Sequence, residues 1–442
     1  MIDEDGRATF ERPSLRSSAT FTFGRKLLVA FLSLLNVLIV ARVLGPAGRG
    51  DIVFVTTLAL ILSQLASLSV QEANINLASR EPRLRRALAS NSLLLALLLG
   101  ALSVGLTAGL IELAPSLAGD AEASVRWLAL ASVPVLILAT YLERLLDAEY
   151  RFAWENIASL ATPVAILGAN GVLALVDRLT VTSAVAAWVL GAVLGTLLRL
   201  WYVGRGLAGF GRPDIPLARR SIGFGMKAHG ARMLGWGNYR VDQLFVGTIA
   251  GSSELGLYSY AVTWAETLFY LPQTLVSVQR PDLVRATRDA AARLAATVYR
   301  VAVLLSLPLA IGLVVLAPFL CTTLAGEDFR GSIDDLRVLV LGTFGVLALQ
   351  LLGNALTGQG RPLLETAATA VAFAATIVLD IALIPTYGGL GAAIASSIAY
   401  TAGGLAAAYL FSRTLGGHFR DLLPRGDELS WFRAKAATLF HR

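Results

Sequence analysis

Cysteine, histidine and charged residues are scarce in this chain. Its 442 residues include one cysteine, Cys321, and three histidines. A single cysteine excludes an internal disulfide and any metal site built from cysteines. The histidines have no cysteine or carboxylate at metal-ligand spacing, so a zinc centre is not expected either. We therefore expect neither a bound metal nor a cofactor.

The sequence also lacks what a membrane enzyme needs. No G-x-x-x-x-G-K-[ST] motif occurs, so the chain does not bind ATP in a P-loop. No extracellular connection exceeds about fifteen residues, which leaves no room for an outer domain. Acid–base or metal-binding groups on sizeable loops are not visible. We expect a protein that is not an enzyme.

Apolar residues are abundant. Hydrophobic residues make up 56% of the chain and charged residues 15%, and the mean hydropathy is +0.67, values typical of polytopic membrane proteins. Runs long enough to cross a ~30 Å hydrocarbon core occur about twelve times. The expected spans are 23–44, 52–78, 87–111, 125–147, 154–176, 181–203, 223–249, 256–279, 300–323, 333–357, 363–384 and 388–412.

The positions of Lys and Arg predict the orientation. Translocating these residues is disfavoured, so they accumulate on the cytoplasmic side. Most of the 37 lie before the first span, in the even-numbered connections or after the last span. Both termini are therefore predicted to be cytoplasmic, in the cell membrane. The net charge of +7 reflects this rule and attraction to anionic lipid, and we expect no nucleic-acid partner.

The chain divides near a connection that contains Gly, Pro and Arg. A shift of 206 positions places Gly45 and Gly50 on Gly251 and Gly256, which indicates a duplication. Two halves that both start in the cytoplasm form a parallel repeat, as in rocking transporters. We expect an all-α polytopic fold of two six-helix bundles around a central, substrate-binding cavity. The expected parts are a cytoplasmic segment 1–22, a first bundle 23–203, a linker 204–222, a second bundle 223–412 and a cytoplasmic tail 413–442.

The seventh span is unusually polar. It carries Lys227, Arg232, Asn238, Arg240 and Asp242. Ionisable groups at membrane depth usually face water or one another and mark a substrate path. We interpret Arg232 and Arg240 as ligands for a phosphate or pyrophosphate, because guanidinium forms bidentate bonds to phosphate oxygens. The alternative is an internal ion pair, and Asn238 is a further candidate on this helix.

Each of the other polar residues in the predicted spans has two possible roles, one in function and one in structure. Lys26 and Lys227 lie near helix ends, where a cation either contacts substrate or extends to the interface. Gln64 and Gln71 belong to a polar run in the second span, suited to binding sugar hydroxyls or to contacts between helices. Candidates for a proton or sodium site are Glu72, Asp242 and Glu266, since buried carboxylates couple ions to transport. Pairing with a nearby arginine is the alternative for these carboxylates.

Several runs resemble the polysaccharide biosynthesis flippase family (Wzx-like). They are Val43 to Pro46, Asn238 to Gly247, Leu255 to Ala261, and Leu383 to Ile394. The resemblance covers roughly residues 20–412. It implies the fold of the multidrug/oligosaccharidyl-lipid/polysaccharide exporter superfamily, abbreviated MOP, with two bundles around a cavity that opens to either side in turn.

The resemblance also implies a cargo and partners. The cargo would be a polyprenyl-pyrophosphate-linked oligosaccharide, and the partners membrane lipids, a polysaccharide polymerase and assembly proteins. Relatives that flip peptidoglycan precursor usually have two more helices and arginines in the first pair, so that role is disfavoured. The alternatives are a cation-coupled small-molecule exporter of the multidrug type and a non-transporting assembly scaffold.

Overall fold

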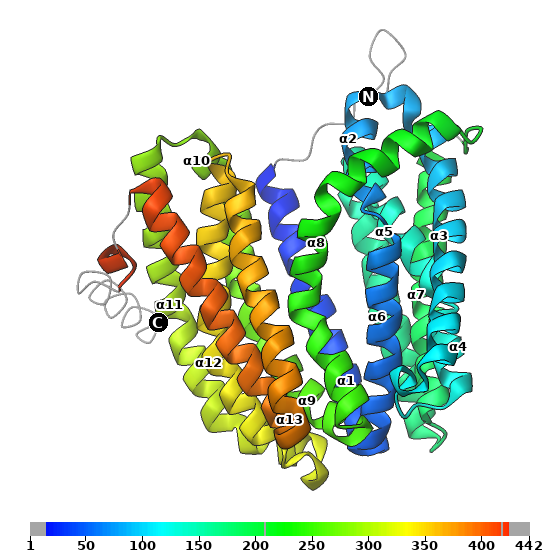
Figure 1. Cartoon of the computed structure of the whole chain (residues 1–442). Helices are drawn as coiled ribbons and strands as arrows, with labels where there is room; N and C mark the ends of the chain where they lie inside the picture. The colour runs from blue at the N-terminus through cyan, green and yellow to red at the C-terminus, as the bar shows by residue number, and fades with distance from the viewer. Residues whose placement is uncertain (1–14, 207–208, 417–418, 424–442) are drawn as a thin grey trace. The chain divides into compact units, whose positions relative to one another are not determined.

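The structure is a computed structural model, and it describes residues 15–206, 209–416 and 419–423. Every regular element in these ranges is helical (Figure 1). The longer helices are α1 (Leu15–Ala66), α2 (Val70–Arg80), α3 (Arg85–Leu113), α4 (Ala123–Leu130), α5 (Val133–Ala148), α6 (Phe152–Leu175), α7 (Val181–Gly206), α8 (Ile215–Ile249), α9 (Ser252–Ala265), α10 (Tyr270–Arg285), α11 (Arg288–Pro318), α12 (Ser332–Gly358) and α13 (Pro362–Leu415). The predicted terminal segments 1–22 and 413–442 lie largely outside the described residues.

Long apolar helices confirm a multi-pass membrane protein. Eight helical segments of the described chain are long and apolar enough to cross a membrane. Two of them, α1 and α13, contain kinks at Gly45 and Gly388, so each supplies two crossings. Helix α8 is more polar, yet its 35 residues extend roughly 50 Å, enough to cross the hydrocarbon layer. With α9 and α10, these segments amount to about twelve crossings, as the sequence predicts.

The chain forms two compact units. The first contains residues up to Val40, Leu58–Pro115 and Glu122–Gly230. The second contains Ala41–Thr57, Ser116–Ala121 and the chain from Ala231 onward. Helices α1 and α8 therefore contribute residues to both units.

In the first unit, α5 is the central helix, in contact with α2, α3, α6 and α7. Its residues Ile137, Tyr141 and Leu142 are fully buried. Small residues bring neighbouring helices close: a Cβ on Gly100 of α3 would lie 2.7 Å from Pro134 of α5. Contacts of this kind are the usual way in which membrane helices pack.

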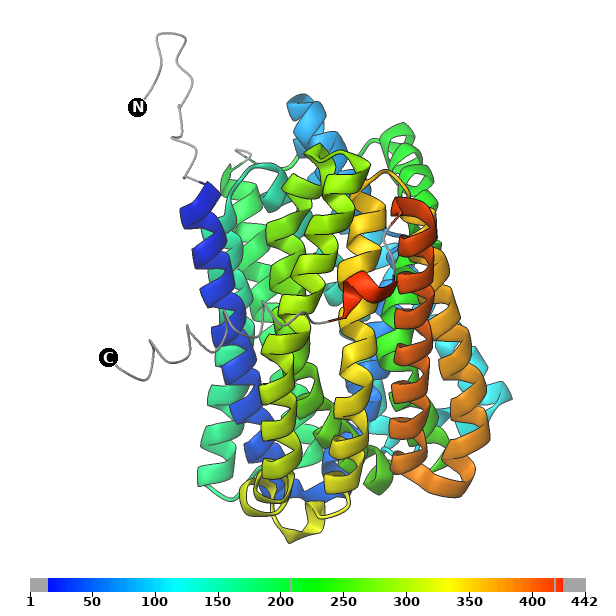
Figure 2. The same cartoon turned by 90° about the vertical axis from the view of Figure 1, so that its left-hand side faces the viewer.

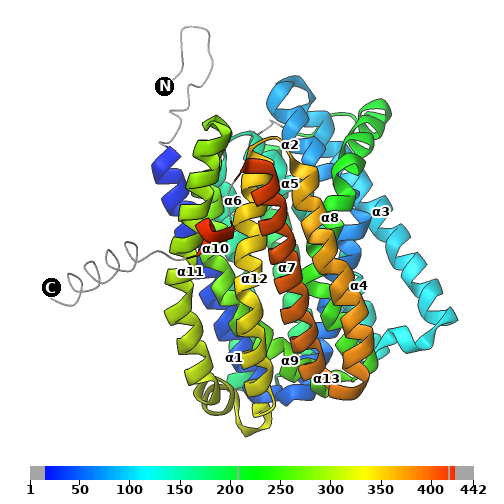
Figure 3. The ribbon, with the colours of Figure 1, turned by 60° about the vertical axis from the view of Figure 1, so that its left-hand side comes forward.

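In the second unit, α11, α12 and α13 lie side by side (Figures 2 and 3). Helices α12 and α13 pack through glycines. A Cβ on Gly345 would lie 2.4 Å from the backbone of Tyr400, and one on Gly404 would lie 2.6 Å from the carbonyl oxygen of Gly345. Only glycine allows the two backbones to approach this closely.

Two turns in the second unit reproduce the sequence repeat. Gly45 has φ 66°, and Gly251, 206 positions later, has φ 88°. A Cβ on Gly50 would lie 1.8 Å from the backbone oxygen of Ser252, and a Cβ on Gly256 would lie 1.9 Å from that of Pro46. The same shift maps one contact onto the other, so the turns pack reciprocally, as expected for a duplication.

Candidate functional site

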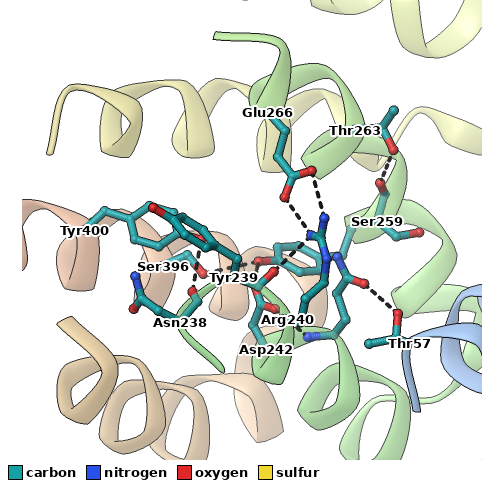
Figure 4. A network of polar contacts seen from close by, with 12 residues as sticks. Thr57, Asn238, Tyr239, Arg240, Asp242, Ser259, Thr263, Glu266, Ser396 and Tyr400 are labelled. Atoms are coloured by element: carbon teal, nitrogen blue, oxygen red, sulfur yellow. Dashed lines mark hydrogen bonds and ion pairs between the residues drawn. The ribbon is translucent and has the colours of Figure 1, made fainter. Parts of the chain in front are cut away.

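The polar residues of α8 lie in two different units. Lys227 belongs to the first unit, and Arg232, Asn238, Arg240 and Asp242 belong to the second. Lys227 is exposed, and Arg232 is half-buried and has an interaction partner. Asn238, Arg240 and Asp242 form part of a polar network in the second unit (Figure 4).

Arg240 makes an ion pair with Glu266, which follows α9 in a short 3₁₀ helix. Its Nη1 lies 2.6 Å from Oε1 of Glu266, and its Nη2 lies 3.2 Å from Oε2. The arginine and glutamate side chains are 27% and 28% exposed. The structure thus joins the predicted phosphate ligand Arg240 to the predicted coupling residue Glu266. The pair offers a reachable guanidinium in a membrane-crossing helix.

Asp242 lies deeper in the same network. It is 2% exposed and accepts hydrogen bonds from the Tyr258 hydroxyl at 2.5 Å and the Ser396 hydroxyl at 3.3 Å. The backbone N–H of Gln243 donates to it as well, at 2.7 Å. Asp242 is therefore held by α8, α9 and α13, and these hydrogen-bond donors stabilise its charged form.

Asn238 connects α8 to α13 one turn earlier. The Thr376 hydroxyl donates to its side-chain oxygen, and the Tyr400 hydroxyl donates to its backbone carbonyl, both at 3.3 Å. Asn238 is 1% exposed, and its side-chain nitrogen has no hydrogen-bond partner within the described chain. It retains a donor for a further ligand.

Asp380 of α13 is a candidate that the sequence reasoning missed. It is fully buried, and neither carboxylate oxygen has a hydrogen-bond partner in the described residues. The negative charge of Asp242 repels a negative charge on Asp380. A buried carboxylate without donors is costly unless it binds a proton or a cation. Its place in the apolar run 363–384 was the available signal.

The predicted glutamines and Glu72 lie in the first unit. Gln71 is fully buried, and neither polar atom of its side chain has a partner among the described residues. Gln64 is 7% exposed. Glu72 is half-buried and has an interaction partner, and Lys26 is exposed.

The first unit has a buried ion pair of its own, which the sequence reasoning also missed. Arg199 of α7 donates to Glu155 of α6 through Nε at 2.8 Å and Nη2 at 2.6 Å. The side chains are 10% and 5% exposed. Their occurrence in facing apolar helices was the signal, because a buried charge requires a partner.

At the end of the first unit, Glu81 lies between two arginines. Arg220 and Arg83 lie 3.0 and 3.3 Å from its carboxylate oxygens. Their hydrogen bonds lower the pKa of Glu81 from its ordinary value of 4.5.

No group of three or more His, Cys, Asp or Glu residues suited to a metal occurs in the described ranges.

Comparison with solved structures establishes the fold. The chain resembles "Lipid II flippase MurJ, inward closed conformation" with a TM-score of 0.73 and 15% identity, covering 91% of this chain and 89% of that one. An inward-facing multidrug resistance MATE family transporter of the MOP superfamily gives 0.70 at 14% identity, with 88% and 94% covered. A MOP superfamily transporter from Pyrococcus furiosus gives 0.64 at 13% identity, with 92% and 97% covered.

Comparison of sequences establishes the family. No curated protein matches the chain. The family described as polysaccharide biosynthesis protein matches residues 39–334. This range includes the runs that carry the resemblance in the first half of the chain and through α9. The chain is a membrane protein of the polysaccharide biosynthesis protein family and has the MOP-superfamily transporter fold.

Proposed function

We propose that this protein is a flippase that moves a polyprenyl-pyrophosphate-linked oligosaccharide across the cytoplasmic membrane by alternating access, for surface polysaccharide biosynthesis. Family membership and the transporter fold support this proposal. The observation that carries it is the accessible Arg240–Glu266 pair in the membrane. The cargo combines a dianionic head group with a lipid, and Arg240 supplies one of the positive charges that this head group requires.

Arg240 binds the pyrophosphate by exchanging partners. In the described state its guanidinium is neutralised by Glu266 through two hydrogen bonds. A phosphate offers the same bidentate geometry, so the cargo replaces the carboxylate without leaving the arginine unpaired. Arg232, two turns earlier on α8, is the second cation. Lys227, Lys26, Gln64, Gln71 and Asn238 are the remaining candidates for contacts to phosphate and sugar.

The proposed source of energy is the gradient of a monovalent cation or a proton across the membrane. Asp242 and Asp380 are both buried in the second unit, and Asp380 has no donor of its own within the described chain. Binding a cation there removes the repulsion between the two carboxylates. Glu266 joins this coupling because cargo on Arg240 releases it. Glu72 is the candidate of the first unit.

The excess of Lys and Arg at one end of the helices supports cytoplasmic termini. It also supports the parts 1–22, 23–203, 204–222, 223–412 and 413–442 as cytoplasmic segment, first bundle, linker, second bundle and tail. A polymerase and assembly proteins are the proposed partners, and catalysis is not part of the proposal.

The experiment measures the lipid intermediates in the native host. Depletion of the protein should cause a polyprenyl-linked oligosaccharide to accumulate, as seen by mass spectrometry of extracted lipids, while the surface polymer falls. Wild type should reverse the accumulation, and Arg240→Gln or Arg232→Ala should not. The matched control is Arg178→Gln, an exposed arginine in a connection. Unchanged lipid intermediates on depletion would contradict the flippase.

A charge swap separates binding from structure. The double variant Arg240→Glu, Glu266→Arg retains an ion pair between the same helices but moves the guanidinium to the other helix. We expect expression and thermal stability close to wild type, with transport still lost. Restored transport in the double variant would show that the pair is needed only for structure.

A cation-coupled small-molecule exporter is the second candidate. The buried pair Asp242 and Asp380 favours it, together with the fold shared with a multidrug transporter. It predicts drug sensitivity on depletion that Asp380→Asn reproduces, without a change in lipid intermediates. A scaffold instead predicts that neutral replacements of Arg232 and Arg240 are tolerated.

A further inference from the structure

The second unit contains a charged cavity near the end at which α11 begins. Its volume is 380 Å³. The short helix η6 (Phe419–Leu422), which supplies Asp421 to the lining, packs against α11. Leu422 of η6 is buried in the core that α10, α11, α12 and α13 form. The lining residues are Asp289, Ala292, Arg293, Ala296, Thr297, Arg300, Leu415, Gly416 and Asp421.

Asp289 and Arg293, which carry opposite charges in the lining of this cavity, make no ion pair with a described residue. Arg300 is buried and is bonded to the Thr297 hydroxyl at 3.1 Å and to the Asp421 carbonyl. Asp289 and Arg293, in contrast, are exposed. They are four residues apart on α11, where oppositely charged side chains usually pair. Neither makes an ion pair with any described residue, so both remain available to a ligand.

The cavity lies at the depth of lipid head groups. Helix α11 has 31 residues and is therefore roughly 46 Å long, against a hydrocarbon core of ~30 Å. Its apolar part is the C-terminal one, from Val301 onward, and its first turns carry Arg288, Asp289 and Arg293. These first turns extend beyond the hydrocarbon layer, where phosphate and ammonium groups of phospholipids are found.

We infer that this cavity binds the head group of phosphatidylethanolamine. Arg293 binds the phosphate, with the positive charge of Arg300 behind it, and Asp289 accepts hydrogen bonds from the ammonium group. The lining contains two arginines and two aspartates, so a zwitterion balances it. An anionic phospholipid would place its charge beside two carboxylates. The quaternary ammonium of phosphatidylcholine has no N–H to donate to Asp289.

Native mass spectrometry of the purified full chain tests this inference. The probes are phosphatidylethanolamine, phosphatidylcholine and phosphatidylglycerol with identical acyl chains. We expect phosphatidylethanolamine to bind about tenfold more tightly than the other two, the size of one charge-assisted hydrogen bond. Asp289→Asn should remove the preference over phosphatidylcholine. Arg293→Gln should weaken all three lipids.

The matched control is Arg288→Gln, which removes a neighbouring charge that does not line the cavity. It should leave the preference unchanged. Equal binding of the three lipids, or equal effects of Arg288→Gln and Arg293→Gln, would overturn the inference. A preference for phosphatidylglycerol that survives in Asp289→Asn would overturn it too, in favour of an anionic lipid. Competition by soluble glycerophosphoethanolamine alone, without lipid binding, would exclude a membrane lipid as the occupant. None of these outcomes depends on transport.

Discussion

The two units each contain a bidentate arginine–glutamate pair between helices, and the pairs differ in exposure. In the first unit, the side chains of Arg199 and Glu155 are 10% and 5% exposed, whereas those of Arg240 and Glu266 in the second are 27% and 28% exposed. The shortest nitrogen–oxygen distance is 2.6 Å in both pairs. The same chemistry is therefore enclosed in one unit and accessible in the other.

This difference separates a structural role from a binding role. In an enclosed pair, neither residue can leave the other without leaving a buried charge unpaired. Because an unpaired buried charge is unfavourable, the pair keeps α6 and α7 together. An accessible pair exchanges one anion for another at lower cost, because solvent or ligand reaches the guanidinium. The comparison predicts that mutations in the first pair act on stability and mutations in the second act on transport.

The largest expected effect follows removal of one partner of the enclosed pair. Glu155→Gln leaves Arg199 charged, buried and without a carboxylate, so we expect a loss of about 3 to 5 kcal/mol of stability. Thermal unfolding of the purified protein in detergent measures this loss. The double variant Glu155→Gln, Arg199→Met should recover most of it. An unchanged melting temperature in the single variant would contradict an enclosed structural pair.

The next effect concerns a buried charge with no partner. Asp380→Asn removes a carboxylate that accepts no hydrogen bond within the described chain, and we expect stability at neutral pH to rise by about 1 to 3 kcal/mol. Transport in proteoliposomes should lose its dependence on the coupling cation. The matched control is Asp334→Asn, an exposed carboxylate at the start of α12. A loss of stability in Asp380→Asn would show that Asp380 is charged and paired.

Disrupting the accessible pair should affect stability less and transport more. For Arg240→Gln we expect a stability loss of about 1 kcal/mol, since partly exposed pairs contribute little, while transport of the lipid-linked oligosaccharide is lost. Measuring melting temperature and lipid accumulation on the same variants separates the two effects. A stability loss as large as that of Glu155→Gln, with transport intact, would reverse the comparison.

The smallest effect belongs to the half-buried carboxylate of Glu81, between Arg83 and Arg220. These arginines lower the pKa of Glu81 from 4.5, so its charged form is favoured in the folded state. The resulting stabilisation is present above pH 4.5 and is lost as the pH falls through the folded-state pKa. Glu81→Gln should melt slightly below wild type at pH 7, and the two curves should converge in acid. A constant difference at all pH values would show that charge is not the cause.

The sequence predicted the fold because a membrane restricts it strongly. Apolar runs of about 20 residues must be helices, since the bilayer offers no other partner for backbone polar groups. The shift of 206 positions also located two matching turns, because Gly45 and Gly251 both adopt positive φ. These features depend on local composition and on residues close in sequence, so they can be read without coordinates.

The pairing of polar residues was harder to predict. The sequence identified Arg240, Asp242 and Glu266 as functional candidates, but it left open whether each binds a ligand, an ion or another side chain. Glu155, Arg199 and Asp380 were not proposed as sites. Each lies in an apolar helix, and its partner or lack of a partner depends on a helix distant in sequence.

The sequence by itself determined the helical membrane architecture, the repeat and the concentration of charge on α8. Only the tertiary structure decided that Arg240 pairs with Glu266, that Tyr258 and Ser396 hold Asp242, and that Asp380 has no hydrogen-bond partner in the described residues. The physical reason is that burial of an ionisable group is a property of the helices around it. Their approach is set by packing contacts between residues far apart in the chain.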